Sequence, residues 1–371
     1  DNAVLALAGD IDVETAKAKV TRFFGDVPAG PPLIKPERWI AKRMEEKREI
    51  MFDDVPQARI YKIWNVPERD TEAAAHFDLA SSILVGGKNS PLYKELVYEK
   101  QIATNVSSFY YDREIAGMFF ITADVVAGVD PAIVEQSMDE VMETFIKKGP
   151  SAKLLKAEKT KAIAGFIRGI QRIGGFGGKS DLLATCQTYT GNPGCYQESA
   201  KYLDAATSSK IKATFAEWID DTPYVLTILP SDQYGLSDES VDRSTGVPYP
   251  TEKVSFKFPT LQTATLSNGA KIVLAQRSDV PLVEMNFQFN FGYAQENNNE
   301  LGFTNFMMDM LNEGTRKYSA LQFDEALDSL GSNLGFGSGL DTSVISLSSL
   351  KGNLADTLDL AKEALINPTF P

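Results

Sequence analysis

A strand that leads into an apolar helix constrains the fold of this chain more than any other feature. Residues 283–291 alternate apolar and polar side chains, which predicts a strand with one buried face. Gly292 follows this strand, and residues 301–315 predict an apolar helix closed by a glycine turn at Gly314. A hairpin at Asn268-Gly269 precedes the strand, because Asn-Gly strongly favours a two-residue turn. Hairpins combined with helices predict an α+β unit.

The rest of the C-terminal part supports this prediction. The capping box Ser319-x-x-Gln322 predicts the start of a helix that ends near residue 330. Residues 334–339 and 342–347 predict another hairpin, and residues 353–365 predict a final helix.

Helix caps organise the N-terminal part of the chain. Asp12, Thr71 and Asp130 each stand where an N-cap residue is expected, directly before a helical pattern. The predicted helices cover residues 13–24, 71–85, 90–100, 131–148, 151–172, 179–189, 196–203 and 207–218. The predicted strands cover residues 4–8, which have the pattern of a buried strand, and 48–52, 58–64, 106–112, 117–125 and 224–229. This order again favours α+β over a wound parallel sheet.

Length and composition predict more than one domain. A chain of 371 residues suits two or three domains, and 43% apolar residues provide for a full-sized core. Residues 233–260 are polar and proline-bearing, so we interpret them as a linker between a unit at 1–232 and a unit at 261–371.

The charge balance excludes several classes of protein. The net charge of −13 argues against nucleic-acid binding, which needs clustered Lys and Arg. No apolar run of about eighteen residues occurs, so we expect no membrane span. A negative surface could attract basic peptides, although most acidic surfaces are only solvated. Because the chain opens at Asp1 without a methionine or a signal peptide, we expect that its natural start lies elsewhere.

Cysteine and histidine are scarce. Cys186 and Cys195 flank a glycine-rich turn and could form one disulfide, which would favour an extracytoplasmic compartment, or remain two buried thiols. His76 is the sole histidine, and a histidine on an apolar helix is most simply a packed side chain. One histidine cannot provide a two-histidine catalytic zinc site.

The helix at 301–315 resembles the zinc helix of the insulinase-type (pitrilysin-like) peptidases. Those enzymes carry an inverted motif, His-x-x-Glu-His, in which two imidazoles bind zinc and the glutamate polarises the attacking water. Here Asn305 and Asp309 occupy the histidine positions, and Met308 occupies the glutamate position. The resemblance therefore implies a degenerate copy with no catalytic and no metal-binding residue. An altered metal site using the oxygens of Asn305 and Asp309 is the alternative to a structural helix.

Further landmarks of the family follow in order along the chain. They are Val4–Asp12, Phe24–Pro28, Leu92–Ser108, Leu266–Gly269 with Ile272–Leu274, Leu330–Ser332 and Asn367–Phe370. The resemblance implies half-domains that each consist of a mainly antiparallel sheet with helices packed on it. It also implies that the chain holds the second half of a first lobe, the linker, and the first half of a second lobe. Some members place an Arg and a Tyr near the scissile peptide, but here Pro91 and Thr104 occupy those positions.

The resemblance implies a central fragment of a bilobal zinc metalloendopeptidase that forms chamber and hinge. Zinc is expected in the parent protein, upstream of Asp1, and this chain alone is expected to be inactive and to hold no cofactor. The implied partners are a peptide substrate and the remaining lobes or a homologous subunit. The alternative is a non-catalytic scaffold subunit of the same family, and an unrelated acidic binding protein is a third hypothesis. The family's habits and the possible disulfide favour the periplasm or another extracytoplasmic place, with the cytoplasm as the alternative.

Two other segments each allow two interpretations. The glycine cluster 174–178 could be a loop that handles peptide or a plain break between helices. The predicted strand 117–125 could be a sheet edge that accepts a peptide as an added strand, or an ordinary interior strand.

Overall fold

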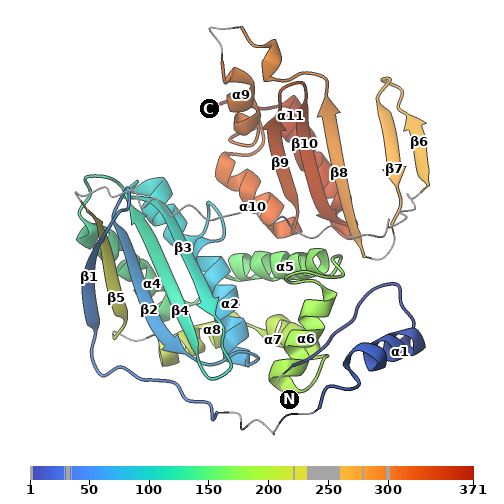
Figure 1. The fold of residues 1–371 in the computed structure, drawn as a ribbon. Coiled ribbons are helices and arrows are strands. Elements are labelled where there is room, and N and C mark those ends of the chain that lie inside the picture. The colour runs from blue at the N-terminus through green and yellow to red at the C-terminus, as the bar shows by residue number, and fades with distance from the viewer. Residues whose placement is uncertain are drawn as a thin grey trace.

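The structure is a computed structural model that describes residues 3–28, 30, 34, 36–219, 222–231, 260–277, 280–297 and 301–371. Residues 233–259 of the predicted linker, which covers 233–260, lie outside the described residues. The described chain forms two α+β units (Figure 1), which confirms the predicted fold class. Within these ranges no helix combines the length and the apolarity needed to cross a membrane.

The first unit is built on a five-stranded sheet with the order β1-β5-β2-β4-β3. Its strands are β1 (Lys47–Asp53), β2 (Arg59–Val66), β3 (Ala103–Tyr111), β4 (Gly117–Val125) and β5 (Tyr224–Pro230). β1 runs parallel to β5, and the other neighbours are antiparallel. β4 pairs with β2 on one side and β3 on the other, so the interpretation of residues 117–125 as an ordinary interior strand is confirmed and the alternative of a free edge is wrong.

Helices pack on this sheet and extend beyond it. They are α1 (Val13–Phe24), α2 (Glu72–Val85), α3 (Pro91–Tyr93) with a π-helical turn at Lys94–Glu99, α4 (Pro131–Lys148), α5 (Ala152–Gly169), α6 (Lys179–Thr190), α7 (Tyr196–Ala205) and α8 (Ser208–Trp218). The side chains of Asp12, Thr71 and Asp130 each accept a backbone N–H at the start of a helix, as predicted. These bonds satisfy amides that have no partner inside the helix.

The core of the first unit lies between the sheet and helices α2, α4 and α8. Phe77, Phe119 and Phe215 are fully buried there, with ring centroids 5.0–5.4 Å apart. Aromatic rings at these distances fill the volume between a pleated sheet and its covering helices.

The predicted strand at residues 4–8 is wrong. Val4, Leu5 and Leu7 are exposed, and none of residues 3–8 pairs with a described strand. An apolar run becomes a strand when a neighbouring strand takes up its backbone hydrogen bonds, and local sequence does not provide that neighbour. α1 likewise buries none of its side chains and lies away from the sheet (Figure 1).

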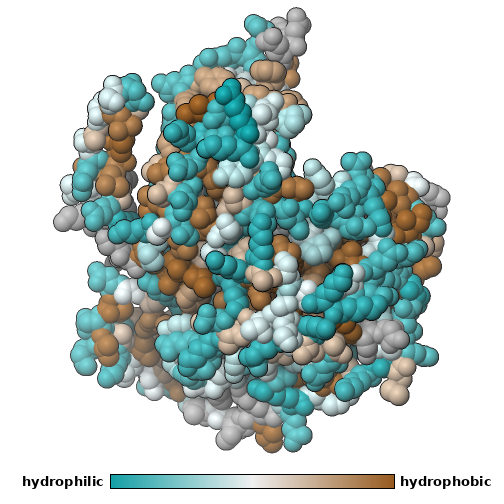
Figure 2. Space-filling model, turned by 180° about the vertical axis from the view of Figure 1, so that it is seen from behind, coloured by the Kyte–Doolittle hydropathy of each residue, from teal (hydrophilic) through white to brown (hydrophobic). Residues whose placement is uncertain are grey.

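The second unit has a three-stranded antiparallel sheet with the order β8-β10-β9. Its elements are β8 (Leu282–Phe289), α9 (Phe303–Met310), α10 (Ala320–Leu330), β9 (Asn333–Ser338), β10 (Ser343–Leu350) and α11 (Leu354–Ile366). The predicted capping box is present, because Ser319 and Gln322 bond each other's backbone N–H. The hairpin of β6 (Leu261–Thr265) and β7 (Lys271–Ala275) forms a separate sheet and stands clear of the second unit with apolar side chains exposed (Figure 2).

Candidate functional site

A carboxylate and a glycine position the helix α9. A Cβ on Gly292 would lie 2.4 Å from the carbonyl oxygen of Gly339, so only glycine allows this close approach of two backbones. Glu296 then accepts hydrogen bonds from the backbone N–H of Thr304 at 2.6 Å and of Gly302 at 2.7 Å. The hydroxyl of Thr304, together with the backbone N–H groups of Thr304 and Gly302, holds the pKa of Glu296 below its usual value, and its negative charge suits a helix N-terminus.

Of the three residues of the degenerate motif on α9, one lies in the core and two are exposed to solvent. Met308, at the glutamate position, is 3% exposed and packs in a cluster with Leu311 and Ile345. Asn305 and Asp309, one turn apart, are both exposed. The described part of the chain contains no group of three or more His, Cys, Asp or Glu residues that could hold a metal ion. Met308 is thus an apolar core side chain, which has no group that could activate water.

The other two family positions also lack catalytic groups. Pro91 starts α3, where its missing N–H costs no hydrogen bond. Thr104 lies at the start of β3 and accepts a hydrogen bond from Gln57 at 2.7 Å. His76 is buried in α2, and its Nδ1 lies 2.7 Å from the hydroxyl oxygen of Thr214. Burial lowers the pKa of His76, which therefore stays neutral in the core near pH 7.

The two cysteines are joined. The structure contains a disulfide between Cys186 and Cys195, whose Cα atoms lie 5.3 Å apart. It connects the C-terminal half of α6 to the residue that precedes α7. The glycine cluster 174–178 lies between α5 and α6, where the backbone N–H of Lys179 donates to Arg172 across the loop. This hydrogen bond closes the loop, as expected for a plain break between two helices.

The two units contact each other along α5 and α10 (Figure 1), a surface that we call the α5–α10 interface. Lys161 of α5 lies 2.8 Å from Asp328 of α10, and Arg168 donates to the carbonyl oxygen of Gly331 at 2.7 Å. Lys88, just after α2, pairs with Glu313 at 2.6 Å. The interface thus includes lysine and arginine contacts from the first unit to acceptors of the second, besides the close approach of Gly331 to Thr160 and Ala164 of α5.

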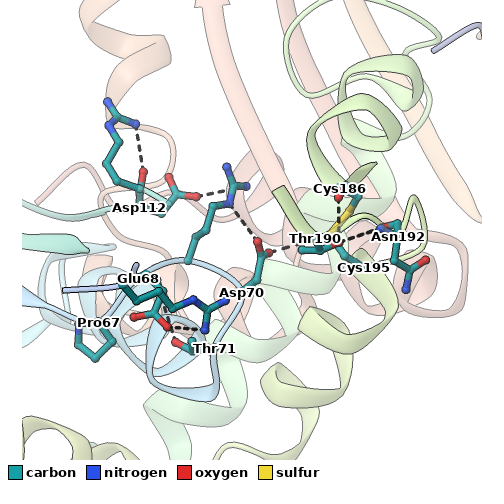
Figure 3. Close-up of polar contacts among 12 residues, drawn as sticks. Pro67, Glu68, Asp70, Thr71, Asp112, Cys186, Thr190, Asn192 and Cys195 are labelled. Carbon is teal, nitrogen blue, oxygen red and sulfur yellow. Dashed lines mark hydrogen bonds and ion pairs between the residues drawn. A yellow bond between two sulfur atoms is a disulfide. The ribbon is translucent and has the colours of Figure 1, made fainter. Parts of the chain in front are cut away.

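Sequence reasoning missed a cavity of about 550 Å³ in the first unit. It lies between α2, α5, α6 and α7, with Tyr110 and Asp112 at the end of β3, and we call it the α2–α7 cavity. Asp70 at its rim lies 3.1 Å from Arg69 and 4.0 Å from the disulfide sulfur of Cys195 (Figure 3). Its φ of +60° is rare for a residue with a side chain. Neither the cavity nor the left-handed backbone of Asp70 has a signal in the local sequence.

Comparison with known proteins agrees with this geometry. Residues 1–162 match the family model described as the peptidase M16 inactive domain, and residues 271–371 match the model of insulinase, peptidase family M16. No curated protein matches the chain.

Several solved structures share the fold. The peptidase M16 inactive domain from Pseudomonas fluorescens is 20% identical, with a TM-score of 0.50 over 60% of this chain and 52% of that one. A protease from Helicobacter pylori is 16% identical, with a TM-score of 0.52 over 60% of this chain and 54% of that one. Pitrilysin is 12% identical, with a TM-score of 0.56 over 96% of this chain and 41% of that one.

The chain spans about half the length of the first two of these structures. At such identities they show a shared fold, while the two family models cover most of the sequence and agree with the landmarks along it. Residues 1–162 match the model of the family's inactive domain, and the insulinase model covers residues 271–371, which include α9. The chain belongs to the insulinase family, peptidase family M16, as a non-catalytic fragment.

Proposed function

We propose that this chain forms the chamber wall and hinge of a bilobal zinc metalloendopeptidase, while residues outside the chain bind zinc and cleave the peptide. The observation that carries the proposal is the burial of Met308, which replaces the water-activating glutamate with a core side chain. The α5–α10 interface supports the hinge role, because polar contacts between two units can open and close at lower cost than a large apolar surface.

In this proposal residues 1–232 are the second half of the first lobe, 233–260 the linker between lobes, and 261–371 the first half of the second lobe. Peptide substrate would contact the chain inside the chamber. The remaining lobes, of the same polypeptide or of a homologous subunit, would complete it. We assign zinc binding to residues of the parent protein outside this chain, and not to Asn305 or Asp309.

The second candidate is a scaffold or partner subunit of the same family that has lost the zinc motif in both lobes. The degenerate α9 favours it, because one copy of the motif has already lost its chemistry. The two candidates differ in whether the first lobe of the parent carries His-x-x-Glu-His.

We further propose an extracytoplasmic location, with the periplasm as the leading compartment and the cytoplasm as the alternative. A disulfide such as Cys186–Cys195 persists in oxidising compartments. Labelling of free thiols in protein taken from its natural host distinguishes these locations, because a cytoplasmic protein would be labelled at both cysteines.

Elemental analysis of the purified chain tests the proposal together with hydrolysis of a quenched fluorescent peptide. We expect no stoichiometric zinc and no cleavage that a chelator abolishes. Stoichiometric zinc, or hydrolysis lost on chelation, would mean that Asp309, Asn305 or His76 contributes to a site and would overturn the assignment.

A further inference from the structure

We propose that the α2–α7 cavity is a binding site for a small organic cation, with the ammonium group of the ligand against Asp78 and its apolar body among the helices. This site lies in the inactive half-domain and is separate from the degenerate motif on α9. It requires no zinc and no hydrolysis, so it is independent of the function proposed above.

The walls of the cavity suit an apolar body. Ile163 and Phe166 come from α5, Leu182 from α6, Leu203 from α7 and Ala74 from α2. Small-molecule sites commonly measure between about 300 and 1,000 Å³, are lined mainly by apolar side chains and contain a few polar groups that orient the ligand. A volume of about 550 Å³ falls inside that range.

The charges around the cavity favour a cation. Its lining includes one cationic side chain, Arg69, against four carboxyl groups, which belong to Asp70, Asp78, Asp112 and Asp204. Arg69 is already engaged, because Nε lies 3.1 Å from Asp70, Nη2 lies 3.4 Å from Asp112, and its guanidinium stacks 4.3 Å from the ring centroid of Tyr189. The cavity therefore keeps an excess of negative charge after its own cation is satisfied.

Asp78 is the carboxyl that has no partner. The described structure gives it neither a hydrogen bond nor an ion pair, although it lines the cavity from the middle of α2. The side chain of Asp78 is exposed to water, although many protein atoms lie around its carboxyl. Burial and then the negative charge of Asp112 raise the pKa of Asp78 to about 7. An ammonium group placed beside it would supply the missing counter-charge.

The groups that face Asp78 come from several elements. They are Tyr110 and Asp112 at the end of β3, Arg69 and Asp70 before α2, and Tyr196 and Asp204 on α7, while the lining residues of α5 and α6 carry no titratable side chain apart from the disulfide. Asp78 is the group among these that titrates near neutral pH. The preference for a cation should therefore rise with pH as this carboxyl ionises.

Two features indicate that the cavity is formed before a ligand arrives. The Cys186–Cys195 disulfide lines the wall and fixes α6 to α7. Asp70 stays in a left-handed conformation while it accepts a hydrogen bond from Arg69 (Figure 3). A preformed site costs less ordering on binding, which favours affinity for a small ligand.

Calorimetric titration of the whole chain with phenylbutylamine, phenylbutanol and phenylbutanoate tests the proposal, because these probes share a body and differ in charge. At about pH 8.5 we expect the amine to bind about tenfold more tightly than the alcohol, as a charge-assisted contact would give, and the acid to bind least. At about pH 5.5 the preference for the amine should disappear, because Asp78 is then protonated while the amine stays charged.

Two variants and one control locate the site. Asp78→Asn should weaken binding of the amine about tenfold at about pH 8.5 and leave binding of the alcohol unchanged. Ala75→Leu, which adds bulk to the cavity wall, should weaken both probes, and Asp341→Asn, an exposed carboxyl of the second unit, should weaken neither. Circular dichroism of each variant verifies that it is folded.

Three results would overturn the proposal. They are an amine that binds no better than the alcohol, an amine affinity that Asp78→Asn leaves unchanged, and an amine affinity that Ala75→Leu leaves unchanged in a folded protein. The last of these would place the ligand outside the cavity.

Discussion

Lys161 Nζ lies 2.8 Å from Asp328 Oδ1 and so joins α5 of the first unit to α10 of the second. The same ammonium group lies 3.0 Å from Glu158, and Asp324 adds a further negative charge near Asp328. Burial lowers the pKa of Lys161, but its bond to Asp328 and the surrounding carboxylates raise it overall. Burial raises the pKa of Asp328 to about 6 despite Lys161. Both pKa values are therefore raised, that of Lys161 by its two carboxylate partners and that of Asp328 mainly by burial.

The stability of the folded chain should therefore fall as the pH rises through the pKa of Asp328. The pKa of Asp328 in the folded chain, about 6, lies above its ordinary value of 3.8, so the folded state binds this proton more tightly than the unfolded state. The contribution of Asp328 to stability is fully present below pH 3.8 and is lost as the pH rises through about 6. We expect a loss on the order of 2 kcal/mol at most in the free energy of unfolding across this range.

Urea unfolding at a series of pH values measures this effect. Asp328→Asn should flatten the dependence between about pH 4 and 7, whereas Asp359→Asn, an exposed carboxyl on α11, should not. The comparison is made in an Asp78→Asn background, because the raised pKa of Asp78 gives a slope of the same sign. If the Asp328→Asn variant kept the full slope, this carboxyl would not be the titrating group.

Gly331 provides a second test of the α5–α10 interface. Its φ is +60°, and an added Cβ would lie 3.1 Å from Thr160 and 3.2 Å from Ala164 of α5. Gly331→Ala thus combines backbone strain with a tight contact and should lower the free energy of unfolding by about 2 kcal/mol. Gly269→Ala has φ of +87° with open space around the new methyl, so it should cost about 1 kcal/mol from strain alone. Equal losses in the two variants would show that α5 does not restrict this position.

Local signals in the sequence predicted much of the fold. Asp12 and Gly25 bracket a helix whose observed bounds are those predicted, because the cap at each end depends on neighbouring residues alone. The parallel pairing of β1 with β5 had no such signal, since Lys47 and Tyr224 are neighbours in space and far apart in the chain. For the same reason the partners of β4 and the unpaired state of residues 4–8 could not be predicted.

One of the two candidate sites could be predicted from the sequence and the other could not. The loss of the motif at Asn305, Met308 and Asp309 can be seen directly from the residue types at these positions. Nothing in the sequence sets Asp78 apart, because its cavity depends on α5, α6 and α7, which come much later in the chain. A raised pKa needs burial by distant segments, so sequence spacing gives no sign of it.

Restoring the glutamate alone should damage the protein and create no metal site. Met308 is buried among apolar side chains, so Met308→Glu would place an unpaired carboxyl in the core. We expect it to lower the free energy of unfolding by about 3 kcal/mol or more. Phe306→Glu, on the same helix and 63% exposed, should stay within about 0.5 kcal/mol of the parent chain. Zinc bound by Met308→Glu at stoichiometric level would contradict the structural role of α9.

Reduction of the Cys186–Cys195 disulfide should loosen the first unit and the α2–α7 cavity together. The bond closes a loop between residues nine positions apart, and in the chain-entropy description such a loop contributes about 2.5 kcal/mol. We expect a reducing agent to lower the urea midpoint of the wild type and to weaken phenylbutylamine binding, because both cysteines line the cavity. The variant with Cys186→Ala and Cys195→Ala should show the lower midpoint from the start and no response to the reductant. A wild-type midpoint that the reductant leaves unchanged would show that α6 and α7 are held in place by packing alone.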